Sequence, residues 1–130
     1  MGKYVATETI RLLISKNFKI KGAKILILGF TFKENCPDYR NTKVIDIHDE
    51  LMKFSADVSI YEPEVSLEDL DKDFNCRFID FKDIELYDAI ILAVPHKRFR
   101  EINWRNMLNK YGVLYDVKSM LPKEYSDGRL

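Results

Sequence analysis

The stretch KILILGFTFKENCPDYRNT, residues 24–42, joins an apolar run to a chemically varied loop. Residues 24–30 are almost all apolar and β-forming, which predicts a strand buried on both faces of a sheet. Residues 29–42 then hold three aromatics, a lysine, an arginine, two acids, a cysteine and a proline. A connecting loop is normally shorter and less varied, so this loop is the first candidate for a functional site.

Strand-like and helix-like segments alternate on either side of the loop. Residues 42–54 carry an apolar row at helical spacing, with Asn41 or Thr42 available as a cap, and residues 57–61 alternate as a strand does. Strand, helix and strand within about forty residues form a right-handed βαβ unit. The other expected elements are helices at 4–16, 66–71 and 98–108, a helical turn at 81–86, strands at 76–79, 88–94 and 112–117, and a tail that is mostly coil.

These elements predict one α/β domain, a doubly wound and mainly parallel Rossmann-like sheet with an N-terminal helix. The 130 residues are enough for one core, and 21 basic residues balance 21 acidic ones, so no excess charge draws nucleic acid or a membrane surface. The sequence holds no bilayer-length apolar run and no signal peptide. Cys36 and Cys76 are far apart and only two histidines accompany them, so we expect no metal site, reduced thiols and a cytoplasmic protein.

Several cations follow the ends of predicted strands. In an open parallel sheet, ligands bind beyond the carboxyl ends of the strands, so Lys33, Lys97 and Lys118 are expected to converge there with Arg40 nearby. Such a cluster suits a phosphate or diphosphate, and the helix that begins near Thr42 adds backbone N–H groups. Two plainer interpretations stay open: a solvated Lys97, and an Arg40 that pairs with a neighbouring acid.

Other polar residues near these strand ends allow more than one interpretation. Asp116 fits a catalytic acid or an aspartate that holds its own loop by hydrogen bonds. His48 is expected on a helix surface, whereas His96 leaves a strand end and is the more interesting histidine. Gly29 stands alone, without the G-x-G-x-x-G of a dinucleotide site. The residues by themselves therefore predict an α/β domain with an anion site and go no further.

The loop also resembles the signature of a known family. GFTFKENCPDYRNT at 29–42, with MGKYVA at 1–6, YDVK at 115–118 and DGRL at 127–130, is similar to the C-terminal domain of the UDP-glucose/GDP-mannose dehydrogenases. The similarity is strongest to the branch that oxidises UDP-N-acetylhexosamines in Vi-antigen and O-antigen synthesis. It covers essentially the whole chain, and the loop motif is highly specific.

The resemblance implies part of an NAD-dependent UDP-sugar 6-dehydrogenase of polysaccharide biosynthesis, which oxidises a C6 alcohol to a carboxylate. Residues 1–20 would end a central dimerisation helix region, and residues 21–130 would form the C-terminal UDP-sugar-binding domain. The parent would be a homodimer whose N-terminal domain holds NAD. The chain would contain no catalytic residue and be inactive alone, because the catalytic cysteine belongs to the central region and is not Cys36.

The resemblance also assigns binding roles. Phe32 and Lys33 correspond to the pair that contacts the UDP-sugar, and Arg40 to the arginine that reaches the NAD held by the other domain. Lys118 stands where UDP-glucose enzymes carry a substrate-binding arginine, and lysine lacks that bidentate fork. Two rival interpretations remain: a free-standing, non-catalytic module that binds nucleotide sugars, and a scaffold whose N-terminal helix drives pairing.

Overall fold

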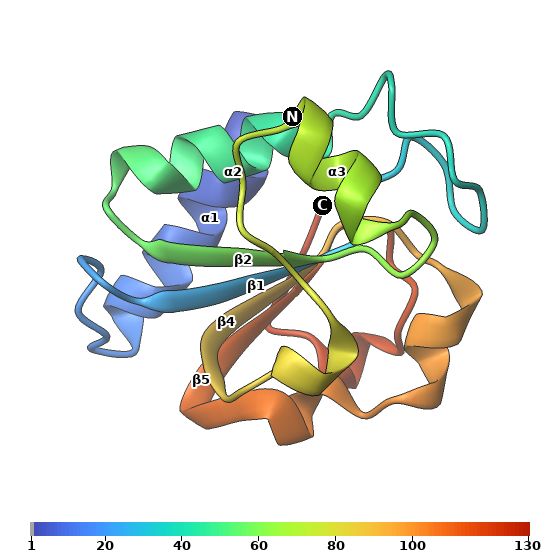
Figure 1. Ribbon diagram of the computed structural model, residues 1–130. Helices are drawn as coiled ribbons and strands as arrows, with labels where there is room; N and C mark the ends of the chain where they lie inside the picture. The colour runs from blue at the N-terminus through green and yellow to red at the C-terminus, as the bar shows by residue number, and fades with distance from the viewer. Residues whose placement is uncertain (1) are drawn as a thin grey trace.

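Six parallel strands form one sheet in the order β3-β2-β1-β4-β5-β6 in the computed structural model, which describes residues 2–130 (Figure 1). The strands are β1 (Lys24–Leu28), β2 (Asp57–Tyr61), β3 (Phe78–Ile79), β4 (Tyr87–Leu92), β5 (Leu108–Asp116) and β6 (Gly128–Arg129). The helices are α1 (Gly2–Ser15), α2 (Val44–Lys53) and α3 (Leu67–Asp73), and the 3₁₀ turns are η1 (Phe81–Asp83), η2 (Lys97–Glu101), η3 (Trp104–Met107) and η4 (Lys123–Tyr125). The predicted parallel α/β fold is confirmed.

The order of the strands reverses between β1 and β4. The chain moves from β1 outward through β2 to β3, returns to the middle as β4, and continues the other way through β5 to β6. Since β1 and β4 pair in parallel register, the loops after them start side by side at the same edge of the sheet. This reversal is the place where open α/β sheets leave a crevice for a ligand.

Side chains alternate cleanly between the two faces of the sheet. Ile25 and Ile27 of β1 face a core that is covered by α1, α2 and α3, whereas Leu26 and Leu28 face a second core. That second core is covered by Phe99 of η2 and other side chains of the short 3₁₀ turns. The blue and green helices lie on one side of the sheet and the yellow and orange turns on the other in Figure 1. Both faces are buried, as the continuous apolar strands predicted.

Helix α1 completes the first of these faces. A right-handed crossover puts α2 over β1 and β2 but sends the β4–β5 connection to the opposite face, which leaves β4 and β5 bare on the α2 side. Helix α1 packs against α2, β4 and β5 and fills that gap. Ala6, Ile10 and Leu13 of α1 are buried in this contact, whereas Ile14 lies outside it and is 58% exposed.

The helix expected over residues 98–108 is wrong. The segment forms η2 and η3, and β5 begins at Leu108 instead of residue 112. The carbonyl of Phe99 accepts a hydrogen bond from the indole Nε1 of Trp104 at 2.9 Å, so it is occupied by a side chain. The side chain of Asn103 caps the next turn through the N–H of Arg105 at 3.2 Å. Burying Trp104 thus replaces a continuous helix with two turns.

The expected surface position of His48 also needs correction, whereas the tail is mostly coil as predicted, with η4 and β6 inside it and β6 paired with β5. His48 is only 6% exposed, with its Nδ1 at 2.9 Å from the Oδ1 of Asp49. Helix α2 packs against α1 as well as β2, so more of its circumference is covered than a surface helix would show.

Candidate functional site

A cavity of about 400 Å³ opens beyond the carboxyl ends of β1, β4 and β5. Its walls are residues 31–34 after β1, 93–95 after β4 and 117–118 after β5. Gly2 and Val5 of α1 and the start of α2, with Lys43 and Val44, close it on the helical side. It therefore lies at the reversal of strand order, where the sheet leaves room for a ligand.

The cavity combines cations with an apolar wall. Lys33, Lys43 and Lys118 line it, and among residues 2–130 none of the three pairs with a carboxylate within 4.0 Å. Phe32 also lines it and leaves 48% of its surface exposed, while Val44 and Ile47 supply aliphatic surface. Three free ammonium groups near the start of a helix, beside an exposed ring, are suited to a large organic anion.

A second hollow of about 440 Å³ adjoins this cavity. The two share Glu34, Pro95 and Lys118, and the second is also lined by Lys97 and Arg100. The structure thus brings Lys33 and Lys118 to one cavity and Lys97 to the next one along the same edge. The three predicted lysines therefore lie along the same edge of the sheet but are divided between two hollows, and Lys118 lines both.

Arg40 stands apart from both hollows. Its side chain is 83% exposed, and its Nε lies 3.2 Å from the Oδ1 of Asp38. The side-chain hydrogen bond from Arg40, with a second from its backbone N–H, holds the pKa of Asp38 below its usual value. Of the two interpretations that the sequence left open, the pairing with a neighbouring acid is the one observed.

The loop of residues 29–42, called the ligand loop below because of its predicted role, is held in place by two buried side chains. The sequence did not assign either of them to a site. Glu62, just after β2, accepts hydrogen bonds on Oε1 from the N–H groups of Phe30 at 2.7 Å and Thr31 at 3.1 Å. The Nε2 of His96, after β4, lies 2.8 Å from the same oxygen. Both side chains are 0% exposed. Each follows a strand end, in Tyr-Glu-Pro and Val-Pro-His, and that position is the signal that could have revealed them.

The outer part of the loop is fastened to α3. The hydroxyl of Tyr39 donates to the Oδ2 of Asp73 at 2.6 Å, and this hydrogen bond raises the pKa of Tyr39 to about 12. The Tyr39 ring also meets the Phe74 ring edge-on, with centroids 6.0 Å apart. The loop, cyan in Figure 1, therefore projects from the sheet edge but is anchored at both ends.

Asp116 holds the loop that carries Lys118. Its Oδ1 accepts from the N–H of Met120 at 3.0 Å, and its Oδ2 accepts from the N–H of Leu121 at 2.7 Å. The residue is fully buried, with both carboxylate oxygens committed to the backbone. Asp116 is thus a loop-organising aspartate, one of the two interpretations of this residue.

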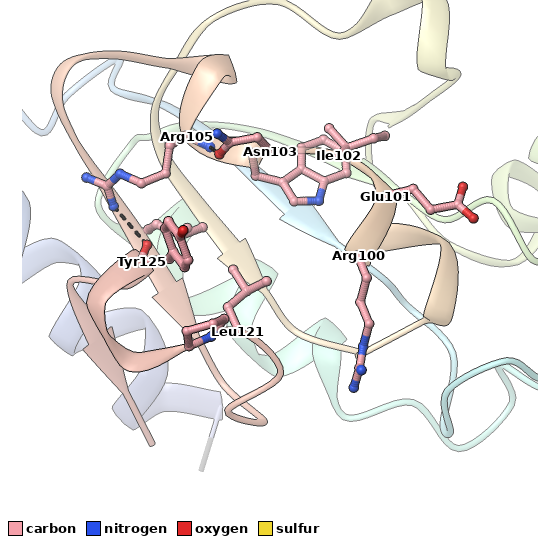
Figure 2. A pocket seen from close by; sticks show the side chains of 10 residues that line it. Arg100, Glu101, Ile102, Asn103, Arg105, Leu121 and Tyr125 are labelled. Carbon is pink, nitrogen blue, oxygen red and sulfur yellow. Dashed lines mark hydrogen bonds between the residues drawn. The ribbon is translucent and has the colours of Figure 1, made fainter.

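A separate hollow of about 400 Å³ lies on the second face of the sheet, between η2, η3 and the segment leading into η4 (Figure 2). Arg105 donates from Nη1 to the carbonyl of Tyr125 at 3.1 Å, and this hydrogen bond joins the two sides of the hollow. Trp104 and Leu114 form part of its lining and also belong to the second core. This hollow lies away from the ligand loop and shares no residue with the lysine-lined cavity.

Residues 2–130 hold neither a cluster of metal-ligating side chains nor a disulfide. Between residues 2 and 130, no three His, Cys, Asp or Glu side chains are grouped so as to hold a metal ion. Both cysteines are free thiols, and burial raises the pKa of Cys76 to about 11. Over the same residues, no helix has the length and apolar character needed to cross a membrane.

Comparisons with known proteins agree with the loop signature. Residues 26–123 match the UDP-glucose/GDP-mannose dehydrogenase family, UDP binding domain. Over 134 residues the chain is 42% identical to the UDP-N-acetyl-D-glucosamine 6-dehydrogenase of Salmonella typhi, and 40% identical to that of Pseudomonas aeruginosa. These alignments cover 100% of this chain but 31% and 32% of the two relatives, so the chain spans about a third of their length.

The fold has close counterparts among solved structures. The crystal structure of the NDP-N-acetyl-D-galactosaminuronic acid dehydrogenase of Methanosarcina mazei Go1 matches with a TM-score of 0.81 over 98% of this chain and 29% of that one. At 19% identity, this likeness establishes the fold alone.

Proposed function

The chain belongs to the UDP-glucose/GDP-mannose dehydrogenase family, and from that premise we propose that its lysine-lined cavity binds a UDP-sugar. The observation that carries the proposal is the set of three uncompensated lysines, Lys33, Lys43 and Lys118, around one cavity at the reversal of strand order. A diphosphate supplies the negative charge that this edge of the sheet lacks. The relatives named above make a UDP-N-acetylhexosamine the preferred substrate class.

The proposed roles follow from the position of each side chain. Lys33 and Lys118 come from the loops after β1 and β5 and face the cavity from two sides, so both are assigned to the charged part of the ligand. Lys43 stands at the start of α2 and adds to the same field. The exposed ring of Phe32 offers an apolar contact to the base or the sugar.

The proposal extends to the whole enzyme of which this chain would be one domain. That enzyme is an NAD-dependent dehydrogenase, in which an N-terminal domain holds NAD and a central dimerisation helix region, ended by residues 1–20, carries the catalytic cysteine. Arg40 supports this arrangement because its guanidinium points into solvent, where a facing domain can meet it. The two free thiols suit the reducing cytoplasm, and the homodimer is proposed from the family resemblance alone.

The isolated chain is expected to bind the substrate but not oxidise it. It contains no G-x-G-x-x-G sequence for a dinucleotide, and Cys36 has no neighbouring base. The measurement is NADH absorbance with UDP-N-acetylglucosamine and NAD. Production of NADH by the purified chain would contradict the assignment of chemistry to the other domain.

Binding is tested by titrating the chain with UDP-N-acetylglucosamine in a calorimeter. Replacing Lys33 with alanine is expected to lower the affinity about tenfold, because a charged hydrogen bond to phosphate is lost. The matched control is Lys82→Ala on η1, which removes the same charge from an exposed site outside the cavity. Equal affinities for the two variants would refute the site, and no binding by the wild type would refute the function.

A further inference from the structure

The buried pair of Glu62 and His96 lies behind the proposed site and does not line it. Burying a charged group costs free energy unless the group forms hydrogen bonds. Most of the hydrogen-bond partners of this pair belong to the ligand loop. Glu62 binds the N–H groups of Phe30 and Thr31 through Oε1 and that of Glu64 through Oε2, the last at 2.7 Å. The carboxylate therefore shapes the turn that leads from β1 to Phe32.

The hydrogen bonds of His96 determine which ring nitrogen carries the proton. The backbone N–H of Asn35 lies 2.8 Å from Nδ1, and a backbone N–H can only donate. Nδ1 is therefore the unprotonated acceptor, and Nε2 carries the proton that it donates to Glu62 at 2.8 Å. The structure thus requires the neutral imidazole with its proton on Nε2.

The same network reaches the backbone on both sides of Lys33. The hydroxyl of Thr31, 3.3 Å from the Nε2 of His96, donates to the carbonyl of Lys33 at 2.7 Å. Asn35 adopts a left-handed backbone, with φ of 58°, and its side-chain oxygen accepts from the N–H of Lys97 at 2.7 Å. Phe32 and Lys33 are thereby held between two anchored residues, Thr31 and Asn35.

We propose that Glu62 and His96 are positioning residues that hold Phe32 and Lys33 in their binding geometry, and that protonation of His96 releases this hold. A proton on Nδ1 meets the N–H of Asn35 head-on, so that hydrogen bond is lost and the loop from Lys33 to Asn35 loosens. The inference rests on the proposed function, since it concerns the affinity of the same cavity. It adds an acid-sensitive control of that affinity, acting through residues that do not touch the ligand.

Few charged groups face the imidazole. Glu62 contacts it directly from the end of β2, and behind Glu62 the carboxylate of Glu64 is paired with Arg98 of η2 at 3.0 Å. From η2 the ring of Phe99 packs on it with a centroid distance of 5.2 Å. From the ligand loop Thr31 and Asn35 contribute only uncharged groups. A proton arriving on Nδ1 therefore meets the Asn35 amide, while the positive charge that it adds to the ring is balanced by the Glu62 carboxylate at Nε2.

The binding experiment uses UDP-N-acetylglucosamine, whose diphosphate is a diester and keeps its charge across the range that histidine titrates. From about pH 7.5 to about pH 5.5, we expect the wild-type affinity to fall about tenfold. His48→Gln is the matched control, because the chain has two histidines and His48 is on α2 outside the network. His48→Gln should keep the pH dependence, and its loss there would overturn the assignment to His96.

Two substitutions of His96 separate positioning from bulk packing. His96→Asn keeps an oxygen that can accept from the Asn35 N–H but cannot be protonated, so its affinity should stay within about threefold of wild type and no longer vary with pH. His96→Phe fills the space without an acceptor and should bind about tenfold more weakly at every pH. Equal binding by both variants, or a pH dependence that survives in His96→Asn, would overturn the proposal.

A measurement without ligand keeps the inference separable from the proposed function. The ¹⁵N resonances of the His96 ring and the amide resonance of Asn35 are followed through the same pH range in the wild-type chain. We expect the Asn35 amide to shift and lose its exchange protection as Nδ1 becomes protonated. An unchanged Asn35 amide, or a ring that stays neutral until the protein unfolds, overturns the release. If these shifts occur but UDP-N-acetylglucosamine never binds, the proposed function is refuted, whereas the role of Glu62 and His96 in holding the loop is supported.

Discussion

The two ends of the sheet treat their charges in opposite ways. At the amino ends of the strands, Lys24 pairs with Glu85, and Arg77 pairs with Asp57 at 2.5 Å. Asp88 is satisfied there too, by the N–H of Lys24 at 3.0 Å and by the side chain of Asn109 at 2.9 Å. At the carboxyl ends, three lysines surround a cavity and none has a carboxylate partner within residues 2–130.

The difference shows at which end of the sheet the charges are neutralised by other residues of the same chain. Opposite charges at the amino end neutralise one another, so that end needs no ligand. Like charges at the carboxyl end repel, and an anion relieves that repulsion on binding. The buried carboxylates on this side, Glu62 and Asp116, spend their oxygens on hydrogen bonds that hold the loops and leave the lysines free.

The two glycines that flank β1 offer the largest test of this contrast. Gly29, at the carboxyl end, has φ of 92°, and a Cβ there would lie 2.5 Å from the Cβ of Val94. Gly29→Ala combines left-handed strain with an overlap against the neighbouring strand exit, so we expect a loss of about 2–5 kcal/mol in the free energy of unfolding. Urea denaturation measures it.

Gly22 is the control at the amino end. Its φ is 81°, but a Cβ there would have no heavy atom within 4 Å. Gly22→Ala should therefore cost only the backbone strain, about 1–2 kcal/mol. If the two alanine variants lose the same stability, the close approach of the β1 and β4 exits is not what makes Gly29 necessary.

Asp127, near the C-terminus, provides a contrast to the unpaired lysines of the cavity, because its carboxylate is paired with two cationic side chains. It accepts from Lys16 at 3.1 Å, Arg105 at 2.9 Å and the N–H of Leu114 at 2.8 Å. Burial raises the pKa of Asp127, but these hydrogen bonds together outweigh burial and leave the pKa below its usual value. Asp127→Asn should cost about 1–3 kcal/mol at neutral pH, because amide donors would then face N–H donors.

The lowered pKa also sets a sign for the effect of acid. The native carboxylate binds protons less readily than the unfolded one, so its contribution is present above about pH 4 and is lost as the pH falls through the native pKa. Urea denaturation at neutral and acid pH measures both proteins. The wild type should lose more stability with acid than Asp127→Asn, and parallel pH profiles would contradict the linkage.

Substitutions of Lys118 test the carboxyl end of the sheet without disturbing the fold. Lys118→Ala should lower the affinity for UDP-N-acetylglucosamine about tenfold while leaving the free energy of unfolding unchanged or slightly higher, because a repelling charge is removed. Lys118→Arg keeps the charge and adds a bidentate fork, so it should bind at least as well as wild type. Calorimetric titration and urea denaturation are both required. A loss of stability in Lys118→Ala would show that the lysine serves the fold.

The smallest expected effect is at the amino end of the sheet, where the charges are paired. Arg77→Ala breaks the ion pair with Asp57, in which the arginine side chain is 61% exposed. Exposed ion pairs contribute a few tenths of a kcal/mol to about 1 kcal/mol, so the change in unfolding free energy should be within that range and the affinity for UDP-N-acetylglucosamine should not change. A clear loss of affinity would mean that the two ends of the sheet are coupled.

Much of this arrangement is legible in the sequence. The apolar runs at 24–30 and 88–94 predicted buried parallel strands, and the composition and family signature of the loop at 29–42 predicted a binding role for it. Local patterns succeed here because a strand buried on both faces must be continuously apolar. They fail at 98–108, where Phe99 and Ile102 have helical spacing but the Trp104 indole takes the Phe99 carbonyl that a helix would need.

The sequence by itself determined the fold class, because buried strands appear as short apolar runs, and its family signature predicted Phe32, Lys33 and Lys118 as binding residues. Only the tertiary structure decided that Lys43 and α1 share their cavity, that Arg40 turns away to Asp38, and that Glu62 and His96 meet behind the loop. Glu62 and His96 are 34 positions apart. Their contact exists because β2 and β4 both pair with β1, and no local pattern in the chain records that pairing.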